Sequence, residues 1–197
     1  MKLFWAPQTR AQRAIWMLEE AGIDYEMERI DIAGPDRADS AEFRAASPMG
    51  KVPAIIDGDV CMSESAAICI YVADRYSGGA LAPAFDDAQR GKYLYWTMYT
   101  PAVIEPAMSE KFNKVETNRY RNGWGDFDLM IETWDRELDN RDWILGDHFT
   151  AADVMLGTSA IFLRLFEMLP ETRNLSDYAD RCLARPANQR ALEKGAG

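Results

Sequence analysis

Hydrophobic positions in the first third of the chain switch between short strand-like runs and helical spacing. Residues 2–5 are short and apolar, which is typical of a buried strand. Residues 11–21 carry apolar side chains at helical spacing, and Gly22 stands where such a helix often ends. Residues 25–32 begin with alternating apolar and polar side chains, which predicts a second strand. The chain therefore opens with a predicted β-α-β unit.

The elements that follow complete a small α/β layer. Residues 41–46 are expected to form a short helix, and residues 52–56 a third strand. An Asp-Gly pair comes next and is a strong hairpin signal, so residues 60–62 are expected to run back as an antiparallel fourth strand. Residues 65–76 return to helical spacing. The predicted order is β-α-β-α-β-β-α, a layered α/β domain.

The pattern changes after residue 76. A Ser-Gly-Gly run with a proline close behind it is typical of a linker. Helical spacing then recurs to the end of the chain, although prolines at positions 101 and 106 must kink or end a helix. We therefore expect an α/β domain, a linker and an all-α domain, at residues 1–76, 77–86 and 87–197.

Composition excludes some classes of function. The chain has 197 residues, of which 48% are hydrophobic and 27% charged, so it can bury a sizeable core. Its net charge of −10 argues against nucleic acid and anionic membranes as partners, because phosphate binding needs clustered Lys and Arg. The sequence shows neither a signal peptide nor an apolar run long enough to span a membrane. We expect a cytoplasmic protein.

The most informative stretch surrounds Pro53, at the start of the third predicted strand. Proline is excluded from the middle of a central strand, and X-Pro bonds are the ones that can be cis. A cis Val52–Pro53 bond would turn the N–H and C=O of Val52 outward, toward a peptide-like ligand. Glu64 and Ser65 open the next helix, where exposed N–H groups attract a carboxylate and the Glu64 side chain can accept an ammonium. A γ-glutamyl group carries both charges at one end.

Short motifs in a fixed order make the chain resemble the cytosolic glutathione transferases, in particular bacterial theta- and beta-like members. The motifs are Thr-Arg-Ala-Gln-Arg, Pro-Met-Gly-Lys-Val-Pro-Ala, Glu-Ser-Ala-Ala-Ile and Phe-Thr-Ala-Ala-Asp, beginning at positions 9, 48, 64 and 149. The resemblance covers essentially the whole chain. It implies a thioredoxin-like domain followed by an all-α domain, glutathione as co-substrate, no permanently bound cofactor and a homodimer.

The resemblance also implies that glutathione's thiol is activated at the turn before the first helix. A free thiol has a pKa of ~8.5, and lowering it by about two units takes roughly 2.7 kcal/mol. Related enzymes use Tyr, Ser or Cys there, whereas this turn has Thr9 as its only hydroxyl. We expect Thr9 Oγ1 and the N–H of Arg10 to contact the sulfur. The alternative is that Thr9 only caps the helix.

Other contacts follow from the same resemblance. Val52 and Pro53 are expected to shape the glutathione site, and Glu64 with Ser65 to bind the γ-glutamyl end. Lys51 is expected either to meet the glycine carboxylate or to remain a solvated loop lysine, and Arg37 is a second basic candidate. A second-substrate pocket for the electrophile is expected in the helical domain, lined by Met98, Tyr99, Val103 and Met108.

Further polar residues are given structural roles. Thr150 with Asp153 predicts a capping box, with Asp in place of the usual Glu. His148, the only histidine, lies in the loop before that cap and is not expected to be catalytic. The three cysteines form no C-x-x-C pair and no His/Cys cluster, so we expect reduced thiols and no metal site.

The leading hypothesis is a glutathione transferase that joins glutathione's thiolate to a small hydrophobic electrophile. Isomerase, lyase and peroxidase reactions would use the same glutathione machinery. A non-catalytic glutathione-binding or partner-binding protein on this fold is the alternative from another class, because fold does not dictate function. A thiol-disulfide enzyme is disfavoured, because no cysteine lies near residues 7–10.

Overall fold

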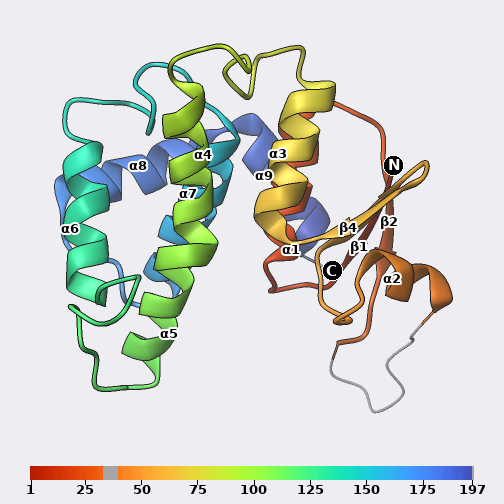
Figure 1. Ribbon diagram of the computed structural model, residues 1–197. Coiled ribbons are helices and arrows are strands. Elements are labelled where there is room, and N and C mark those ends of the chain that lie inside the picture. Colours follow the sequence, from red (N-terminus) through yellow and green to blue (C-terminus); the bar gives the residue numbers. More distant parts are fainter. Residues whose placement is uncertain (33–39, 197) are drawn as a thin grey trace. The chain divides into compact units, whose positions relative to one another are not determined.

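The computed structural model describes residues 1–32 and 40–196. Their contacts divide into two compact units (Figure 1). The N-terminal unit comprises Met1–Leu81 together with Ala184–Gly197, and the helical unit comprises Ala82–Leu183. The sequence pattern places Ala184–Gly197 in the all-α domain, whereas its contacts group it with the α/β elements.

The N-terminal unit is built on a four-stranded sheet with the order β2-β1-β3-β4. Its strands are β1 (Lys2–Trp5), β2 (Glu26–Arg29), β3 (Ala54–Asp57) and β4 (Val60–Ser63). β1 pairs in parallel with β2 and antiparallel with β3, and β3 pairs antiparallel with β4 across the predicted Asp-Gly turn. With the helices α1 (Ala11–Ala21), α2 (Ala41–Ala46) and α3 (Ser65–Tyr76), this confirms the predicted element order and the thioredoxin-like arrangement.

Helices cover both faces of this sheet (Figure 1). Phe4 and Ala54 belong to a buried cluster with Phe43 of α2, and the Phe4 and Phe43 ring centroids lie 5.4 Å apart. Successive side chains of a strand point to opposite faces, so Leu3 and Ile55 face the other side, on which α1 and α3 pack. Leu3 and Ile55 are both fully buried, at 0% exposure. The apolar side chains of β1 and β3 thus fill two separate layers, one on each face of the sheet.

The last helix, α9 (Pro186–Gly195), packs on α1 through paired charges. Glu19 is a nearly buried carboxylate that accepts hydrogen bonds from Arg190 Nε at 2.8 Å, Lys194 Nζ at 2.5 Å and the Tyr25 hydroxyl at 2.7 Å. Arg185 bridges to the neighbouring Glu20, with Nε 2.6 Å from Oε1. These contacts join the end of the described chain to its first helix.

The helical unit begins with a long helix that changes geometry midway. α4 (Arg90–Tyr99) continues into a π-helical turn, η1 (Thr100–Ile104), and then into α5 (Glu105–Phe112). Pro101 lies in the π turn, where its missing N–H removes one regular helical hydrogen bond, and Pro106 lies in the first turn of α5. The expected interruption is therefore confirmed as a change of helical pitch.

The remaining helices are α6 (Phe127–Glu137), α7 (Ala151–Leu165) and α8 (Arg173–Ala184). The predicted capping box at the start of α7 is confirmed. Asp153 is fully buried and accepts hydrogen bonds from the N–H groups of Ile144 (2.8 Å) and Thr150 (2.9 Å) and from the Tyr178 hydroxyl (2.9 Å). Burial raises the pKa of Asp153 to about 6, against the opposing effect of these hydrogen bonds.

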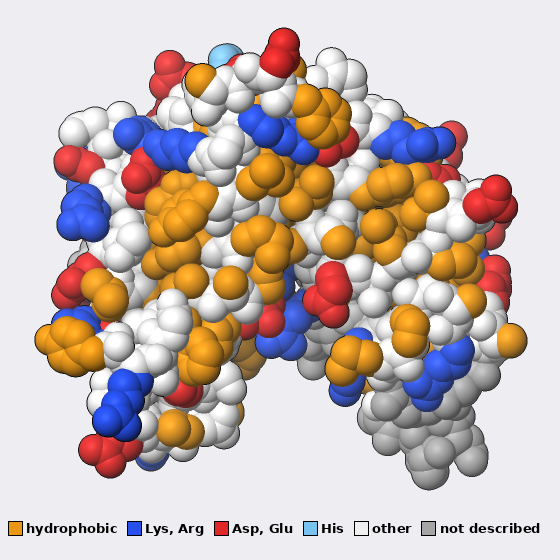
Figure 2. All heavy atoms as spheres, in the orientation of Figure 1, with side chains coloured by type: hydrophobic (Ala, Val, Ile, Leu, Met, Phe, Trp, Pro, Cys, Tyr) orange, Lys and Arg blue, Asp and Glu red, His pale blue; other side chains and the backbone are white. Residues whose placement is uncertain are grey.

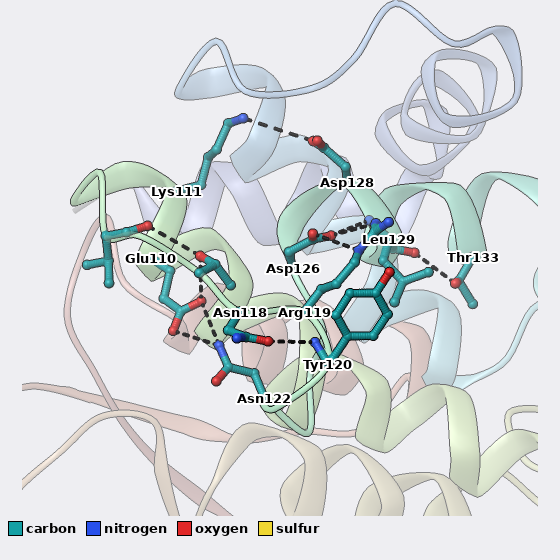
Figure 3. Close-up of polar contacts among 12 residues, drawn as sticks. Glu110, Lys111, Asn118, Arg119, Tyr120, Asn122, Asp126, Asp128, Leu129 and Thr133 are labelled. Atoms are coloured by element: carbon teal, nitrogen blue, oxygen red, sulfur yellow. Dashed lines mark hydrogen bonds and ion pairs between the residues drawn. The ribbon is translucent and has the colours of Figure 1, made fainter.

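The loop between α5 and α6 is held by two carboxylates (Figure 3). Glu110 accepts hydrogen bonds from side chains spread along that loop, those of Thr117, Asn122 and Trp124. Asp126 accepts a hydrogen bond from the Leu129 N–H at 2.8 Å, which caps α6, and pairs with Arg119 at 2.9 Å. Polar contacts thus order a long connection that carries little regular structure.

Candidate functional site

The segments singled out in the sequence meet at one end of the sheet. Ala54 lies opposite Phe4 of β1 and opposite Ser63 of β4. The turn that follows β1, the segment that precedes Ala54 and the start of α3 that follows Ser63 must therefore emerge at the same edge. β2 runs parallel to β1, so residues 30–32 emerge there too. Strand register thus brings together the motifs that begin at positions 9, 48 and 64 of the sequence.

A cavity of about 270 Å³ lies at this edge. Its described lining consists of Gln8, Thr9, Arg10, Ile32, Gly50, Lys51 and Val52. Thr9, Arg10, Lys51 and Val52 among these were predicted to bind glutathione. Among the described lining residues two are cationic and none is acidic, although the whole chain carries a net charge of −10. The described lining therefore favours an anionic ligand.

Thr9 uses its hydroxyl within the turn. Its Oγ1 donates a hydrogen bond to the Ala6 carbonyl at 2.7 Å and accepts one from the Ala11 N–H at 3.2 Å. The second contact satisfies the N–H of the first residue of α1, although the cap position itself is occupied by Arg10, which makes no side-chain cap hydrogen bond. To donate to a ligand's sulfur, the hydroxyl would have to rotate away from Ala6. The contact between Thr9 and the sulfur stays a prediction.

The Lys51 segment is fixed by a serine that the sequence analysis did not identify. Ser47 is fully buried; its hydroxyl accepts from the Lys51 N–H at 2.8 Å and donates to the Lys51 carbonyl at 2.7 Å. A serine directly before the Pro48 motif was the available signal. The Val52–Pro53 bond is cis, as expected, and Val52 precedes the part of β3 that pairs with β1.

Glu64 and Ser65 lie beside Pro53 in the fold. Pro53 precedes Ala54 and Glu64 follows Ser63, and the register pairs Ala54 with Ser63. Glu64 is exposed and has a left-handed φ of +75°, which a residue with a Cβ adopts at some energetic cost. Pro53, Glu64 and Ser65 are not among the described lining of the cavity. Their contacts with a γ-glutamyl group stay a prediction.

The residues proposed for the second substrate belong to the helical unit. Met98 of α4 is exposed, and Val103 and Met108 are half-buried in η1 and α5. Tyr99 is buried, its hydroxyl donates to the Met130 carbonyl at 3.1 Å, and its ring lies 4.8 Å from that of Trp96. Tyr99 therefore packs in the core of that unit. Contact of these residues with an electrophile stays a prediction.

A larger cavity, of about 550 Å³, lies in the helical unit between the end of α5 and the start of α6. It shares no residue with the predicted pocket. Its lining carries both charges, and some of them pair: Lys111 lies 4.0 Å from Asp128 and 5.2 Å from the centre of the Phe127 ring (Figure 3). Volume alone favours this cavity, but only the smaller one combines a single sign of charge with the predicted site residues.

The other residues considered in the sequence are Arg37, His148 and the three cysteines. Arg37 lies outside the described residues. His148 is exposed. No group of His, Cys, Asp and Glu within the described chain is arranged to hold a metal ion, and none of its helices is long and apolar enough to cross a membrane. Cys61 is exposed, while Cys69 and Cys182 are buried; burial raises the pKa of the Cys69 thiol to about 12.

Comparison with known proteins gives relatives for both units. Residues 9–75 match the sequence model for the glutathione S-transferase N-terminal domain, and residues 117–181 match that for its C-terminal domain. Glutathione S-transferase 3 of Schizosaccharomyces pombe is 28% identical, over 94% of this chain and 84% of that protein. The disulfide-bond oxidoreductase YfcG of Escherichia coli is 25% identical, over 98% of this chain and 94% of that protein.

Solved structures agree over the full length. BphK, a bacterial glutathione S-transferase solved as a ternary complex, superposes with a TM-score of 0.84 at 26% identity and covers 100% of both chains. A sphingomonad glutathione S-transferase, solved in complex with glutathione, superposes with a TM-score of 0.80 at 26% identity, over 99% of this chain and 98% of that one. With both family domains present in order on this fold, the chain belongs to the glutathione S-transferase family.

Proposed function

We propose that this protein is a glutathione transferase that binds glutathione in the cavity beside α1. The observation that carries the proposal is the convergence of Thr9, Arg10, Lys51 and Val52 on one cationic cavity. Related structures with bound glutathione support the choice of ligand. In this proposal glutathione is a co-substrate, and the protein holds no permanent cofactor.

The proposed reaction needs the thiol of glutathione to lose its proton to solvent. The thiolate then forms an S–C bond to a small hydrophobic electrophile, and any leaving group departs with the electron pair of the bond that breaks. Arg10 and the N-terminus of α1 stabilise the negative sulfur, since both place positive charge beside it. The remaining contribution is positioning of the two reactants.

Each end of glutathione has a proposed partner. Lys51 pairs with the glycine carboxylate, and the main chain of Val52 pairs with the cysteinyl main chain. Glu64 accepts from the γ-glutamyl ammonium, while the N–H groups at Ser65 hold its carboxylate. The electrophile contacts Met98, Val103 and Met108, and the buried Tyr99 takes no part in this contact.

Substitution of Lys51 tests the binding site. Lys51→Ala removes a cation from the cavity, so glutathione affinity falls about tenfold, equivalent to roughly 1.4 kcal/mol. Lys111→Ala, in the other cavity, is the matched control and leaves affinity unchanged. Calorimetric titration with glutathione measures both. Equal affinities in wild type and Lys51→Ala would remove Lys51 from the site, and no binding by the wild type would refute the proposed function.

A non-catalytic glutathione-binding or partner-binding role is the second candidate. The hydrogen bond from the Thr9 hydroxyl to Ala6 favours it, because that hydroxyl is already engaged within the turn. Isomerase, lyase and peroxidase reactions remain further candidates that share the same machinery. Binding of glutathione without turnover on a panel of electrophiles, isomerisable substrates and peroxides would favour the non-catalytic role.

A thiol-disulfide activity is a third candidate, since one relative is named a disulfide-bond oxidoreductase. The described turn before α1 holds no cysteine, and Cys61 is the exposed thiol of the chain. Glutathione-dependent reduction of a small disulfide measures this activity. Loss of that reduction in Cys61→Ser would give the thiol a direct role; reduction that survives would leave glutathione as the sole source of sulfur.

We further propose a cytoplasmic homodimer. None of the three cysteines is in a disulfide, which suits a reducing compartment. Hydrophobic side chains gather on the surface over α4 in Figure 2. The side chains of Leu94 and Tyr95 are 38% and 54% exposed. An exposed apolar stripe of this kind is typical of a surface that a second protein covers.

A further inference from the structure

Gln8 lines the cavity beside α1 and has no assigned role. It lies in the turn between β1 and α1, and its side chain is exposed. Its carboxamide makes no hydrogen bond within residues 1–32 and 40–196. Gln8 therefore offers the cavity an amide group that the described part of the fold does not use.

Its neighbour Thr9, by contrast, already uses its hydroxyl in a hydrogen bond within the turn. The Thr9 hydroxyl hydrogen is donated to the Ala6 carbonyl at 2.7 Å, and breaking that bond would weaken the turn. The Gln8 carboxamide has two N–H donors, and it breaks no hydrogen bond to residues 1–32 or 40–196 when it donates to a ligand. A hydrogen bond from a neutral donor to an anion is stronger than one between neutral groups.

Gln8 also occupies a backbone conformation that suits glycine. Its φ is +56°, in the left-handed region, where a side chain raises the energy of the turn. A glycine would relieve that strain but would remove the amide. The fold thus keeps a donor-bearing side chain at a position where local stability favours none.

We propose that Gln8 is a catalytic residue of this cavity, and that its carboxamide N–H donates a hydrogen bond to the sulfur of the bound glutathione thiolate. The inference rests on the proposed function, and it names the side chain that takes the part expected of Thr9. The hydrogen bond stabilises the thiolate over the thiol, since a negative sulfur is the better acceptor. Formation of the S–C bond is otherwise as described above.

Two variants of Gln8 separate the effect of the amide donor from the effect of backbone strain. Gln8→Ala removes the amide and keeps a Cβ at the left-handed position; Gln8→Gly removes both. In both variants the bound thiol's pKa, read from thiolate absorbance against pH, should rise by about one unit, a tenfold loss of thiolate at a fixed pH below it. Of these two variants, only Gln8→Gly should raise the Tm, because it removes the Cβ from the left-handed position. Glu167→Gly, at an exposed position with φ +56° in the helical unit, is the matched control, which should raise the Tm and leave the thiol unchanged.

The outcomes distinguish this inference from the proposed function. If the wild type lowers the pKa of bound glutathione and both Gln8 variants lower it equally, the role of Gln8 is refuted and the proposed function stands. If the wild type does not bind glutathione, or binds it without a shift in pKa, both fall. A raised pKa in the two Gln8 variants, with the control unchanged, supports the inference.

Discussion

Two hydroxyl groups hold the segments that form the candidate site. Thr9 ties the turn before α1 to Ala6 and Ala11, and the buried Ser47 ties both main-chain groups of Lys51. Neither hydroxyl has to touch a ligand to matter. Each fixes a stretch of backbone that lines the cavity, so their removal should affect stability and binding together.

Ser47→Ala tests whether loss of one such hydroxyl lowers stability and glutathione binding together. It leaves the Lys51 N–H without its partner, which costs about 1–3 kcal/mol of unfolding free energy. Glutathione affinity should fall as well, because Lys51 and Val52 lose their fixed position. Ser40→Ala is the matched control: Ser40 caps α2 through the Phe43 N–H at 3.0 Å, so its loss should cost about 1 kcal/mol with affinity unchanged. Urea unfolding and calorimetric titration measure the two effects. Unchanged affinity in Ser47→Ala would show that its role is purely structural.

At the scale of elements, the packing of α9 on α1 depends on a carboxylate that stays charged. Burial by itself would raise the pKa of Glu19, but hydrogen bonds from Lys194, Arg190 and Tyr25 outweigh burial and hold that pKa below its usual value. A carboxylate with a lowered folded-state pKa stabilises the fold above its unfolded pKa. That stabilisation is lost as the pH falls through the folded value.

Glu19→Gln should therefore destabilise the protein most near neutral pH. The expected loss is about 1–3 kcal/mol, since hydrogen bonds to a charged group are removed while Arg190 and Lys194 remain half-exposed and hydrated. The difference from wild type should shrink as the pH falls below about 4. Chemical unfolding at several pH values measures the difference. A gap that stays constant between neutral and acidic pH would show that the charge of Glu19 does not hold α9.

The helices and strands also show which parts of the fold could be predicted from the sequence. Local signals were sufficient for the Asp-Gly hairpin, the proline-interrupted helix and the Thr150–Asp153 cap, because each depends on residues close together in the chain. The position of α9 was missed because Glu19 and Arg190 lie 171 residues apart. Gln8 was missed because a cavity's lining depends on strand register. Ser47 was missed although its partner Lys51 is only four residues away and a local signal was available.

For the whole molecule, the net negative charge and one exposed apolar surface determine whether copies of the chain associate. The net charge of −10 keeps copies of the chain apart unless a specific contact outweighs their repulsion. The exposed stripe of Leu94 and Tyr95 on α4 is the candidate for that contact. A homodimer would bury these side chains and would still leave the acidic surface hydrated.

Tyr95→Glu tests this surface. A carboxylate at the centre of an apolar contact would be desolvated on both copies, so the dimer should dissociate into monomers. Tyr120→Glu, at a tyrosine that is 92% exposed in the loop before α6, is the matched control and should not change the mass. Sedimentation equilibrium measures both. A Tyr95→Glu protein with the same mass as wild type would exclude this stripe as the interface.

The most direct test of the account is the pKa of glutathione's thiol when bound to the wild-type protein. Thiolate absorbance is followed against pH, at saturating glutathione, with free glutathione as reference. We predict a bound value at least about one unit below the free value of ~8.5, since Arg10, Lys51 and the donors of the α1 turn all favour the charged sulfur. A bound thiol that titrates like the free one would contradict the account and would leave a protein that binds glutathione without activating it.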